Sequence, residues 1–285
     1  MTLENLAQIS NYAVASATGI LALAFVAYVA QWGFARNVAP ERELVNAGSV
    51  DVVTNGSDPV ERSNMAGGIG LSLTTLSAAI LLIGVVTRGL AAERVPWGNM
   101  YEFGCAATLA ALTAYLVLER VWEIEWVGPI ITGFGTVVLG ASAMVYVPAG
   151  PLVPALHSYW LVIHVLGAII SGSAFLVGAA ASVLYLVKSR AERNTPEDQR
   201  AGFLWRIPAS AKIDQVAYRV HAFAFPIWTF AALIAGPIWA QYAWAATGAG
   251  TPRRSGRSSP GLSTPATCTP ARPPAGRARP RRSWR

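Results

Sequence analysis

The chain has 285 residues, of which 53% are hydrophobic and only 13% are charged, a balance outside the usual range of soluble domains. Its formal net charge of +7 comes from residues 245–285, which hold nine arginines and no acidic residue, whereas residues 1–244 carry 13 basic and 15 acidic side chains. The basic excess therefore does not indicate nucleic-acid binding, and two cysteines without a Cys-x-x-Cys-His motif exclude a disulfide framework and a c-type cytochrome.

Six apolar stretches are each long enough to cross a membrane, because a bilayer core of about 30 Å needs roughly 20 helical residues. They span about residues 12–34, 67–88, 100–118, 127–147, 159–187 and 220–243. The first does not resemble a signal peptide, because residues 1–11 contain no Lys or Arg. We therefore predict an all-α fold, a multi-pass transmembrane helical bundle over residues 1–244.

The basic residues between these stretches predict the orientation of the bundle. Residues 35–66, 119–126 and 188–219 together hold eleven Lys and Arg, whereas the alternate connections hold two, Arg88 and Arg94. Cytoplasmic loops are enriched in these residue types, so the N-terminus is predicted to lie outside. Two outer segments are then residues 95–103 and 148–160, and a third follows the last span.

The first outer segment contains two candidate site residues, Trp97 and Glu102. A tryptophan at this depth is usually part of an interfacial aromatic belt. A carboxylate that enters the membrane is costly unless it is paired; the start of a helix reduces that cost, and Arg88 or Arg94 could be the partner. These residues therefore have both a structural and a ligand-binding interpretation.

The second outer segment leads into the fifth span, where His164 lies about one turn inside the boundary marked by Tyr159 and Trp160. Its structural interpretation is a hydrogen bond to a neighbouring helix. Its functional interpretation is a ligand, because ionisable groups within spans often serve function and imidazole is a common axial ligand of haem iron. His157 is expected in a solvated loop, and His221, at the other end of the bundle, is expected to be structural or interfacial rather than a ligand.

The sixth span ends in a run of aromatic residues that includes Trp239, Tyr242 and Trp244. These side chains could form another interfacial belt or an aromatic platform for a flat ligand. Beyond Trp244 the sequence consists mostly of Arg, Pro, Ser, Thr, Gly and Ala, a composition typical of a disordered tail.

Three stretches resemble the haem-handling membrane proteins of system II cytochrome c biogenesis, the CcsA/CcsB/ResC type with its tryptophan-rich WWD domain. They are Val95–Phe103, His157–Val165 and Asp214–Trp244, and with the pattern of spans the resemblance covers nearly all of residues 1–244. It implies a protein of a bacterial plasma membrane that receives haem b from the cytoplasmic side. The haem is presented on the outer face for thioether attachment to the Cys-x-x-Cys-His motif of apocytochrome c. A large ResB-type partner subunit would complete this cytochrome c synthetase.

The resemblance also implies roles for individual residues. His164 matches by position the first of two outer histidines that ligate the haem iron, and Trp244 matches the first tryptophan of the haem-binding loop. We expect haem to contact His164, Trp239, Trp244, Trp97 and Glu102, with His164 as the axial ligand and with no catalytic residue assigned. The alternatives are a small multi-pass transporter and a structural membrane subunit without haem.

The resemblance stops at Trp244. In the family the loop continues roughly Trp-Gly-x-Tyr-Trp-x-Trp-Asp-Pro-Lys-Glu, whereas residues 245–252 here read Ala-Ala-Thr-Gly-Ala-Gly-Thr-Pro. Residues 244–252 can be encoded by TGG GCC GCT ACT GGG GCT GGG ACC CC. One G restored after the Trp codon turns this into codons for Trp-Gly-Arg-Tyr-Trp-Gly-Trp-Asp-Pro. The same frame permits a family-like continuation to residue 276, including a seventh span with a histidine.

We therefore interpret residues 245–285 as the product of an out-of-frame translation that follows a lost base or a sequencing error. The chain would then lack most of the tryptophan-rich loop and the second outer histidine. A closed two-histidine haem site could not form, and we expect the polypeptide to be unstable or inactive. The alternative is a genuine low-complexity tail, solvated and disordered.

The nucleotide sequence tests this hypothesis. We expect the run of G near codon 245 to be one base shorter than the family-like frame requires, which resequencing of the gene measures. If neither of the other two frames contains a tryptophan-rich continuation after codon 244, the hypothesis is wrong.

Overall fold

The computed structural model describes residues 2–35, 59–150, 156, 158–196, 200 and 202–247. Within these ranges the chain is helical and contains no strand, which confirms the predicted all-α fold. The elements are α1 (Leu3–Phe34), α2 (Pro59–Ala91), α3 (Met100–Trp122), the 3₁₀ turn η2 (Glu125–Val127), α4 (Gly128–Met144), α5 (Tyr159–Asn194), α6 (Phe203–Arg206), α7 (Ser210–Thr229), the π-helical segment η5 (Phe230–Ala235) and α8 (Gly236–Thr247).

Six helical segments are long and apolar enough to cross a membrane, as the sequence predicts. They are Leu3–Phe34, Pro59–Ala91, Met100–Trp122, Glu125–Met144, Tyr159–Asn194 and Ser210–Ala243. Several extend beyond the predicted spans, because polar turns at their ends stay helical although they are not apolar; α5, for example, continues past residue 187 to Asn194. Of the predicted tail, residues 245–247 continue α8, and the remainder lies outside the described residues.

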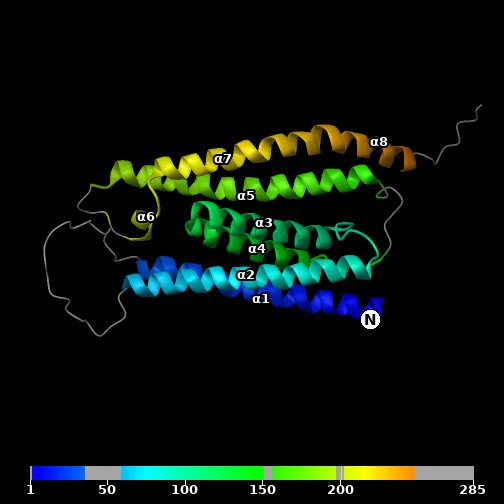
Figure 1. Ribbon diagram of the computed structural model, residues 1–285, viewed down its shortest axis with the longest axis horizontal. Helices are drawn as coiled ribbons and strands as arrows, with labels where there is room; N and C mark the ends of the chain where they lie inside the picture. Colours follow the sequence, from blue (N-terminus) through cyan, green and yellow to red (C-terminus); the bar gives the residue numbers. More distant parts are fainter. Residues whose placement is uncertain are drawn as a thin grey trace, which may run out of the picture. The chain divides into compact units, whose positions relative to one another are not determined.

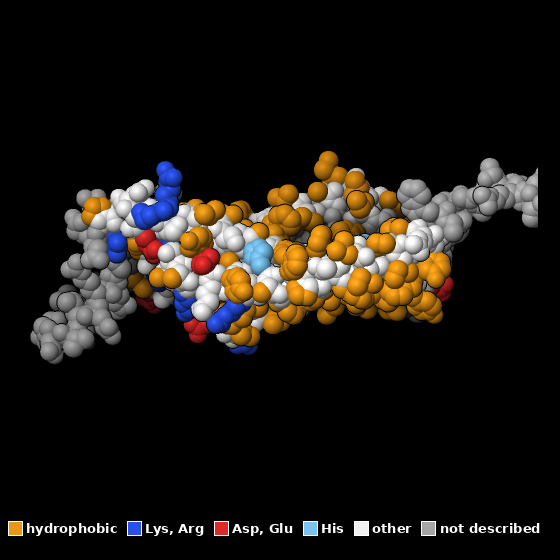
Figure 2. Space-filling view, turned by 90° about the horizontal axis from the view of Figure 1, so that it is seen from above, with side chains coloured by type: hydrophobic (Ala, Val, Ile, Leu, Met, Phe, Trp, Pro, Cys, Tyr) orange, Lys and Arg blue, Asp and Glu red, His pale blue; other side chains and the backbone are white. Residues whose placement is uncertain are grey.

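Each long helix runs antiparallel to the next one along the chain (Figure 1). Helices α1 and α2 form one pair, α3 and α4 lie beside them, and α5 packs against α7 on the other side. One end of this bundle, here called the N-terminal end, contains the start of α1, the connection 92–99, the start of α5 and the end of α8. The opposite end contains η2 and α6. On the face seen in Figure 2, most of the visible charged side chains gather at the opposite end, and the remainder shows mainly hydrophobic side chains together with backbone and other uncharged groups.

A pair of buried tyrosines fixes the spacing between α1, α3 and α4. The hydroxyl groups of Tyr28 and Tyr115 lie 2.9 Å apart, so one donates a hydrogen bond to the other inside the apolar core. The Tyr28 ring needs glycine on both neighbouring helices. A Cβ at Gly70 would lie 2.9 Å from the ring, and one at Gly128 would lie 2.6 Å from it.

Helix α6 joins the two sides of the bundle at the opposite end. Phe203 stacks on Trp32 of α1 with ring centroids 4.7 Å apart, and Arg206 donates hydrogen bonds to the side chains of Ser63 and Asn64 on α2. Lys188 of α5, only 3% exposed, donates to the carbonyl oxygen of Leu204 at 2.6 Å. The positive charge of Lys188 therefore also has a structural role, beyond the orientation signal read from the sequence.

We expect Gly128→Ala to lower the free energy of unfolding by about 1–3 kcal/mol, because the new methyl group overpacks the tyrosine pair. Unfolding of the detergent-solubilised protein by denaturant titration measures this change. The matched control is Gly140→Ala on the same helix, where a Cβ would meet no atom within 4 Å. That control should be neutral or stabilising by up to about 1 kcal/mol, because alanine favours the helix. Equal losses in both variants would contradict this account.

Candidate functional site

His164 lies in the second turn of α5, a helix capped by Ser158, whose hydroxyl accepts a hydrogen bond from the Trp160 amide at 3.2 Å. The imidazole Nδ1 lies 2.8 Å from the carbonyl oxygen of Ala231 in η5. This contact is the hydrogen bond to a neighbouring helix that the structural interpretation predicts. It does not exclude a ligand role, because metal-binding imidazoles commonly donate one ring N–H to a carbonyl and use the other nitrogen for the metal.

The π-helical geometry of η5 brings this carbonyl to the histidine. The Gly236 amide bonds back to the Ala231 oxygen, the five-residue spacing of a π-turn, directly before Pro237, which has no amide hydrogen to continue an α-helical ladder. Gly236 also lets the imidazole approach, because a Cβ there would lie 3.1 Å from its Nδ1 atom. This irregular turn and a glycine thus hold the ring of His164 in one orientation.

Trp239 completes this arrangement from α8. Its ring lies nearly parallel to the imidazole of His164, with centroids 5.9 Å apart and planes 11° apart, and both side chains are partly exposed. The structure therefore brings together two of the predicted haem contacts. The backbone of Trp244 continues α8, while its side chain lies outside the described residues, as does all of His157.

Glu102 lies in a different group, the arginine cluster, defined here as Arg88, Arg94 and Glu102. The carboxylate is 1% exposed and accepts from the Arg88 Nε at 3.1 Å, from the Arg94 Nη1 at 2.7 Å and from the Gly98 amide at 2.9 Å. Both arginines suggested by the sequence are thus partners. Because both carboxylate oxygens are already bonded, a direct contact with haem would require one of these bonds to break.

The arginine cluster also binds the connection after α4. Arg88 donates to the Val147 carbonyl oxygen, and Arg94 donates to that of Gly150 at 3.0 Å. The Arg88 guanidinium lies 5.2 Å from the ring centroid of Tyr101 and 5.5 Å from that of Tyr146. A single carboxylate therefore organises α2, α3 and both connections at the N-terminal end.

Trp97 lies on the other side of α5 from His164. It lines a cavity of about 410 Å³ together with Ser158 and Val162. His164 is two positions beyond Val162, about 200° around the helix, so the two residues face nearly opposite directions. The five predicted contacts therefore do not form one cavity. His164 and Trp239 form one group, Trp97 and Glu102 belong to another, and the Trp244 side chain is not described.

His221 has the structural environment expected from its position. Its Nδ1 lies 2.7 Å from the Ala217 carbonyl oxygen in its own helix, and its ring centroid lies 5.8 Å from that of Phe175. Gly178 makes room for it, because a Cβ there would lie 2.5 Å from the ring. This histidine packs α7 against α5.

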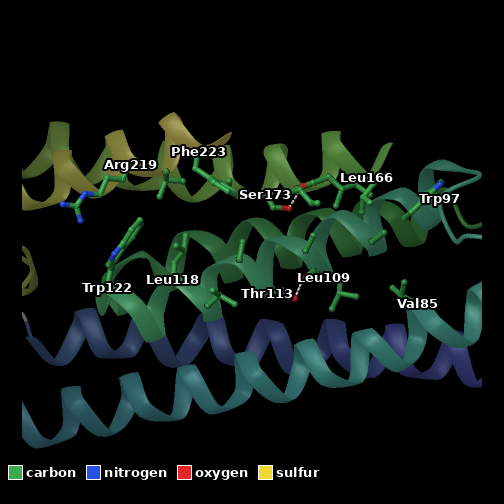
Figure 3. Close-up of a pocket in the computed structure, with 18 residues that line it drawn as sticks. Val85, Trp97, Leu109, Thr113, Leu118, Trp122, Leu166, Ser173, Arg219 and Phe223 are labelled. Atoms are coloured by element: carbon green, nitrogen blue, oxygen red, sulfur yellow. Dashed lines mark hydrogen bonds between the residues drawn. The ribbon is translucent and has the colours of Figure 1, made fainter. Parts of the chain in front are cut away.

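Sequence reasoning missed a lateral groove of about 690 Å³ between α3 and the pair α5 and α7 (Figure 3). Arg219 and Trp122 line one end of the groove and Trp97 the other. Its wall residues are apolar, as lipid-facing residues also are, so hydropathy could not distinguish them. The one available signal was the regular spacing of Ala106, Ala110 and Ala114, which places small side chains on one face of α3.

Comparison with known proteins gives a consistent family. The model of the family described as "Cytochrome C assembly protein" matches residues 97–253, which extends nine residues beyond Trp244, where the resemblance in motifs stops. The chain is 29% identical over 192 residues to the cytochrome c biogenesis protein CcsA of Guillardia theta, covering 62% of this chain and 64% of the relative. It is 30% identical over 199 residues to the CcsA of Synechococcus sp. (strain CC9902), covering 62% of this chain and 65% of that relative. The chain thus spans just under two thirds of their length. No solved structure matches it.

We expect Glu102→Ala to destabilise the protein by about 3–5 kcal/mol, because loss of one partner leaves buried charge on Arg88 and Arg94 uncompensated. Denaturant titration in detergent measures the loss. The matched control is Glu93→Ala, an exposed glutamate in the adjoining connection, which should change stability by less than about 0.5 kcal/mol. A stable Glu102→Ala protein would show that the cluster does not organise this end.

Proposed function

This chain belongs to the cytochrome C assembly protein family, and on that premise we propose that it handles haem b for cytochrome c biogenesis. In this function the bundle takes up haem from the cytoplasmic side and presents it on the outer face for attachment to the Cys-x-x-Cys-His motif of apocytochrome c. Because this chain lacks most of the tryptophan-rich loop, we expect the function to be impaired in it. The relatives named as cytochrome c biogenesis proteins support this proposal over a transporter or a subunit without haem. The observation that carries it is the orientation of His164.

The hydrogen bond from His164 determines which ring nitrogen can meet a metal. When Nδ1 donates to the Ala231 carbonyl, Nε2 keeps its lone pair and can bind haem iron as an axial ligand. The carbonyl bond also keeps the ring from rotating. Trp239 lies parallel beside it and provides an apolar surface for the porphyrin.

The same proposal places the N-terminal end of the bundle on the outer face of a bacterial plasma membrane. At that end, Arg88 and Arg94 are paired with Glu102, whereas Lys188, Arg206 and Lys212 lie at the opposite end. Basic residues concentrate on the cytoplasmic side of membrane proteins. His164 then lies near the outer surface, where apocytochrome c is modified.

A second histidine ligand would come from outside the described residues. Among those residues the other histidine is His221, which packs within the bundle between α7 and α5. The apocytochrome, a ResB-type partner subunit or the in-frame continuation of the gene can supply the ligand. Only 17% of the most apolar part of the last span, Ser210–Ala243, is buried inside the bundle. Its exposed surface can therefore contact such a partner. With His164 alone, this chain would hold haem weakly.

The covalent step needs little chemistry from this chain. A thioether forms when a cysteine S–H adds across a vinyl C=C bond of haem, so the sulfur binds one carbon and the hydrogen the other. The role proposed for His164 and Trp239 is to position the porphyrin, so that its vinyl groups face the cysteines of the apocytochrome.

Replacement of His164 tests this function. We expect His164→Gly to lower haem affinity at least roughly tenfold. Loss of a residue that only hydrogen-bonds a metal ligand already lowers metal affinity about tenfold or more, and loss of the ligand itself should cost at least as much. Added imidazole should restore the absorption spectrum of histidine-ligated haem, because it fills the space left by the side chain. The measurement is haem titration of the purified full chain in detergent.

His221→Gln is the matched control, because His221 is a histidine of the same bundle that packs α7 against α5. It should leave haem affinity unchanged. Unchanged haem binding by His164→Gly, or a spectrum that does not respond to imidazole, would contradict the proposed ligand.

A further inference from the structure

The lateral groove has apolar walls along its whole length. On α3, the alanines Ala106, Ala110 and Ala114 leave space, and Ile169 belongs to the opposite wall. Phe223 lies on that opposite wall too (Figure 3). The hydroxyl groups of Thr113 and Ser173 donate to carbonyl oxygens of their own helices, Leu109 and Ile169. These hydroxyls therefore do not need a polar ligand, and the walls suit an apolar body.

The groove follows the membrane direction. Its wall on α3 extends from Ala106 to Trp122, which corresponds to about 24 Å at 1.5 Å per residue. A bilayer core is about 30 Å thick, so the groove crosses most of it. It thus connects the two ends of the bundle on the side away from His164.

Each end of the groove leads to an arginine. At the opposite end, the Arg219 guanidinium lies 6.0 Å from the ring centroid of Trp122. At the N-terminal end, Trp97 lines both the groove and the 410 Å³ cavity that contains Arg94. A further cavity of about 600 Å³ shares Val85 with the groove and Arg94 with that cavity. Arg219, the groove, Trp97 and the cavities that contain Arg94 therefore follow one another from one end of the bundle to the other, and together they are called the track.

A ligand for this track must combine a large apolar body with anionic groups. A charge could not rest midway, because apolar walls do not compensate it. Arg219 lies at one end, and at the other end an anion would share the guanidinium of Arg94 with Glu102, to which Arg94 is already paired. Haem has this chemistry, with a flat apolar ring and two carboxylates. We propose that haem moves along the groove from Arg219 to Arg94, past Trp97, before His164 binds it; this step rests on the proposed function.

The lining of the groove is suited to the passage of haem and not to its retention. Within the described part of the chain, no His, Cys or Met side chain lines it, so the iron meets no ligand there. The Arg94 cavity includes Ser158 and Tyr159 at the first turn of α5. Haem that leaves this cavity passes around the start of α5 to reach His164 on its other side.

A cysteine reporter tests this track. Both native cysteines, Cys105 and Cys268, are replaced by alanine, and Ala110→Cys is introduced in the groove of the full chain in phosphatidylcholine nanodiscs. The rate of alkylation by a membrane-permeant maleimide is measured with and without iron protoporphyrin IX. At a haem concentration about ten times the Kd the rate should fall about tenfold, because only the free fraction reacts. Arg219→Gln should remove this protection, and Arg219→Lys should retain part of it.

The matched control is Val137→Cys, which lies on α4, is 70% exposed and does not line the groove. Its alkylation rate should not respond to haem. Equal protection at both cysteines would overturn the track, because haem would then act through the lipid. A second result would also overturn the track: phosphatidylglycerol protects Ala110→Cys in the absence of haem, and added haem does not displace that lipid. This result would assign the groove to a lipid chain.

A second measurement remains informative if an arginine variant does not fold. Ala110→Trp fills the groove and should slow the appearance of His164-ligated haem in proteoliposomes, whereas Val137→Trp should not. In detergent, where the N-terminal end is directly accessible, both should bind haem alike. Equal rates for the two variants in proteoliposomes would overturn the track while the proposed function stands. Absence of His164-dependent haem binding in detergent would instead defeat the proposed function itself.

Discussion

The carboxylate of Glu102 is bonded to two arginines, Arg88 in the last turn of α2 and Arg94 in the connection that follows. A buried charge of this kind is tolerated only when its partners surround it. Those partners also hold the carbonyl groups of Val147 and Gly150, so both connections at the N-terminal end are anchored to one point. The cavity beside Trp97 and the first turn of α5 depend on that anchoring, because Arg94 lines the cavity.

Helix α5 separates two environments with different chemistry. One face presents His164 to η5 and α8, where an irregular turn offers a carbonyl and Trp239 offers a flat surface. The other face lines the apolar groove and the cavity of Arg94. A cargo that is first soluble in the membrane and then bound through its metal needs both kinds of surface. A single helix that carries one on each side keeps the two steps close without mixing them.

The same division fits the proposed cargo. An apolar track bounded by arginines selects a large apolar anion, whereas an oriented imidazole selects a metal. Haem satisfies both conditions, and a phospholipid satisfies only the first. The family relationship and the geometry of His164 therefore support each other from independent observations.

Hydropathy alone determined the number and order of the membrane spans, because the cost of exposing polar groups to lipid requires long runs of apolar residues. Motifs identified the family and singled out His164. The motifs could not reveal that Trp97 and Glu102 lie apart from His164, because this separation depends on how the helices pack around α5. The π-turn that holds His164 and the groove ending at Arg219 join residues distant in the chain. Only the tertiary structure decided these features, because apolar side chains at a helix interface, in a groove and against lipid look alike in sequence.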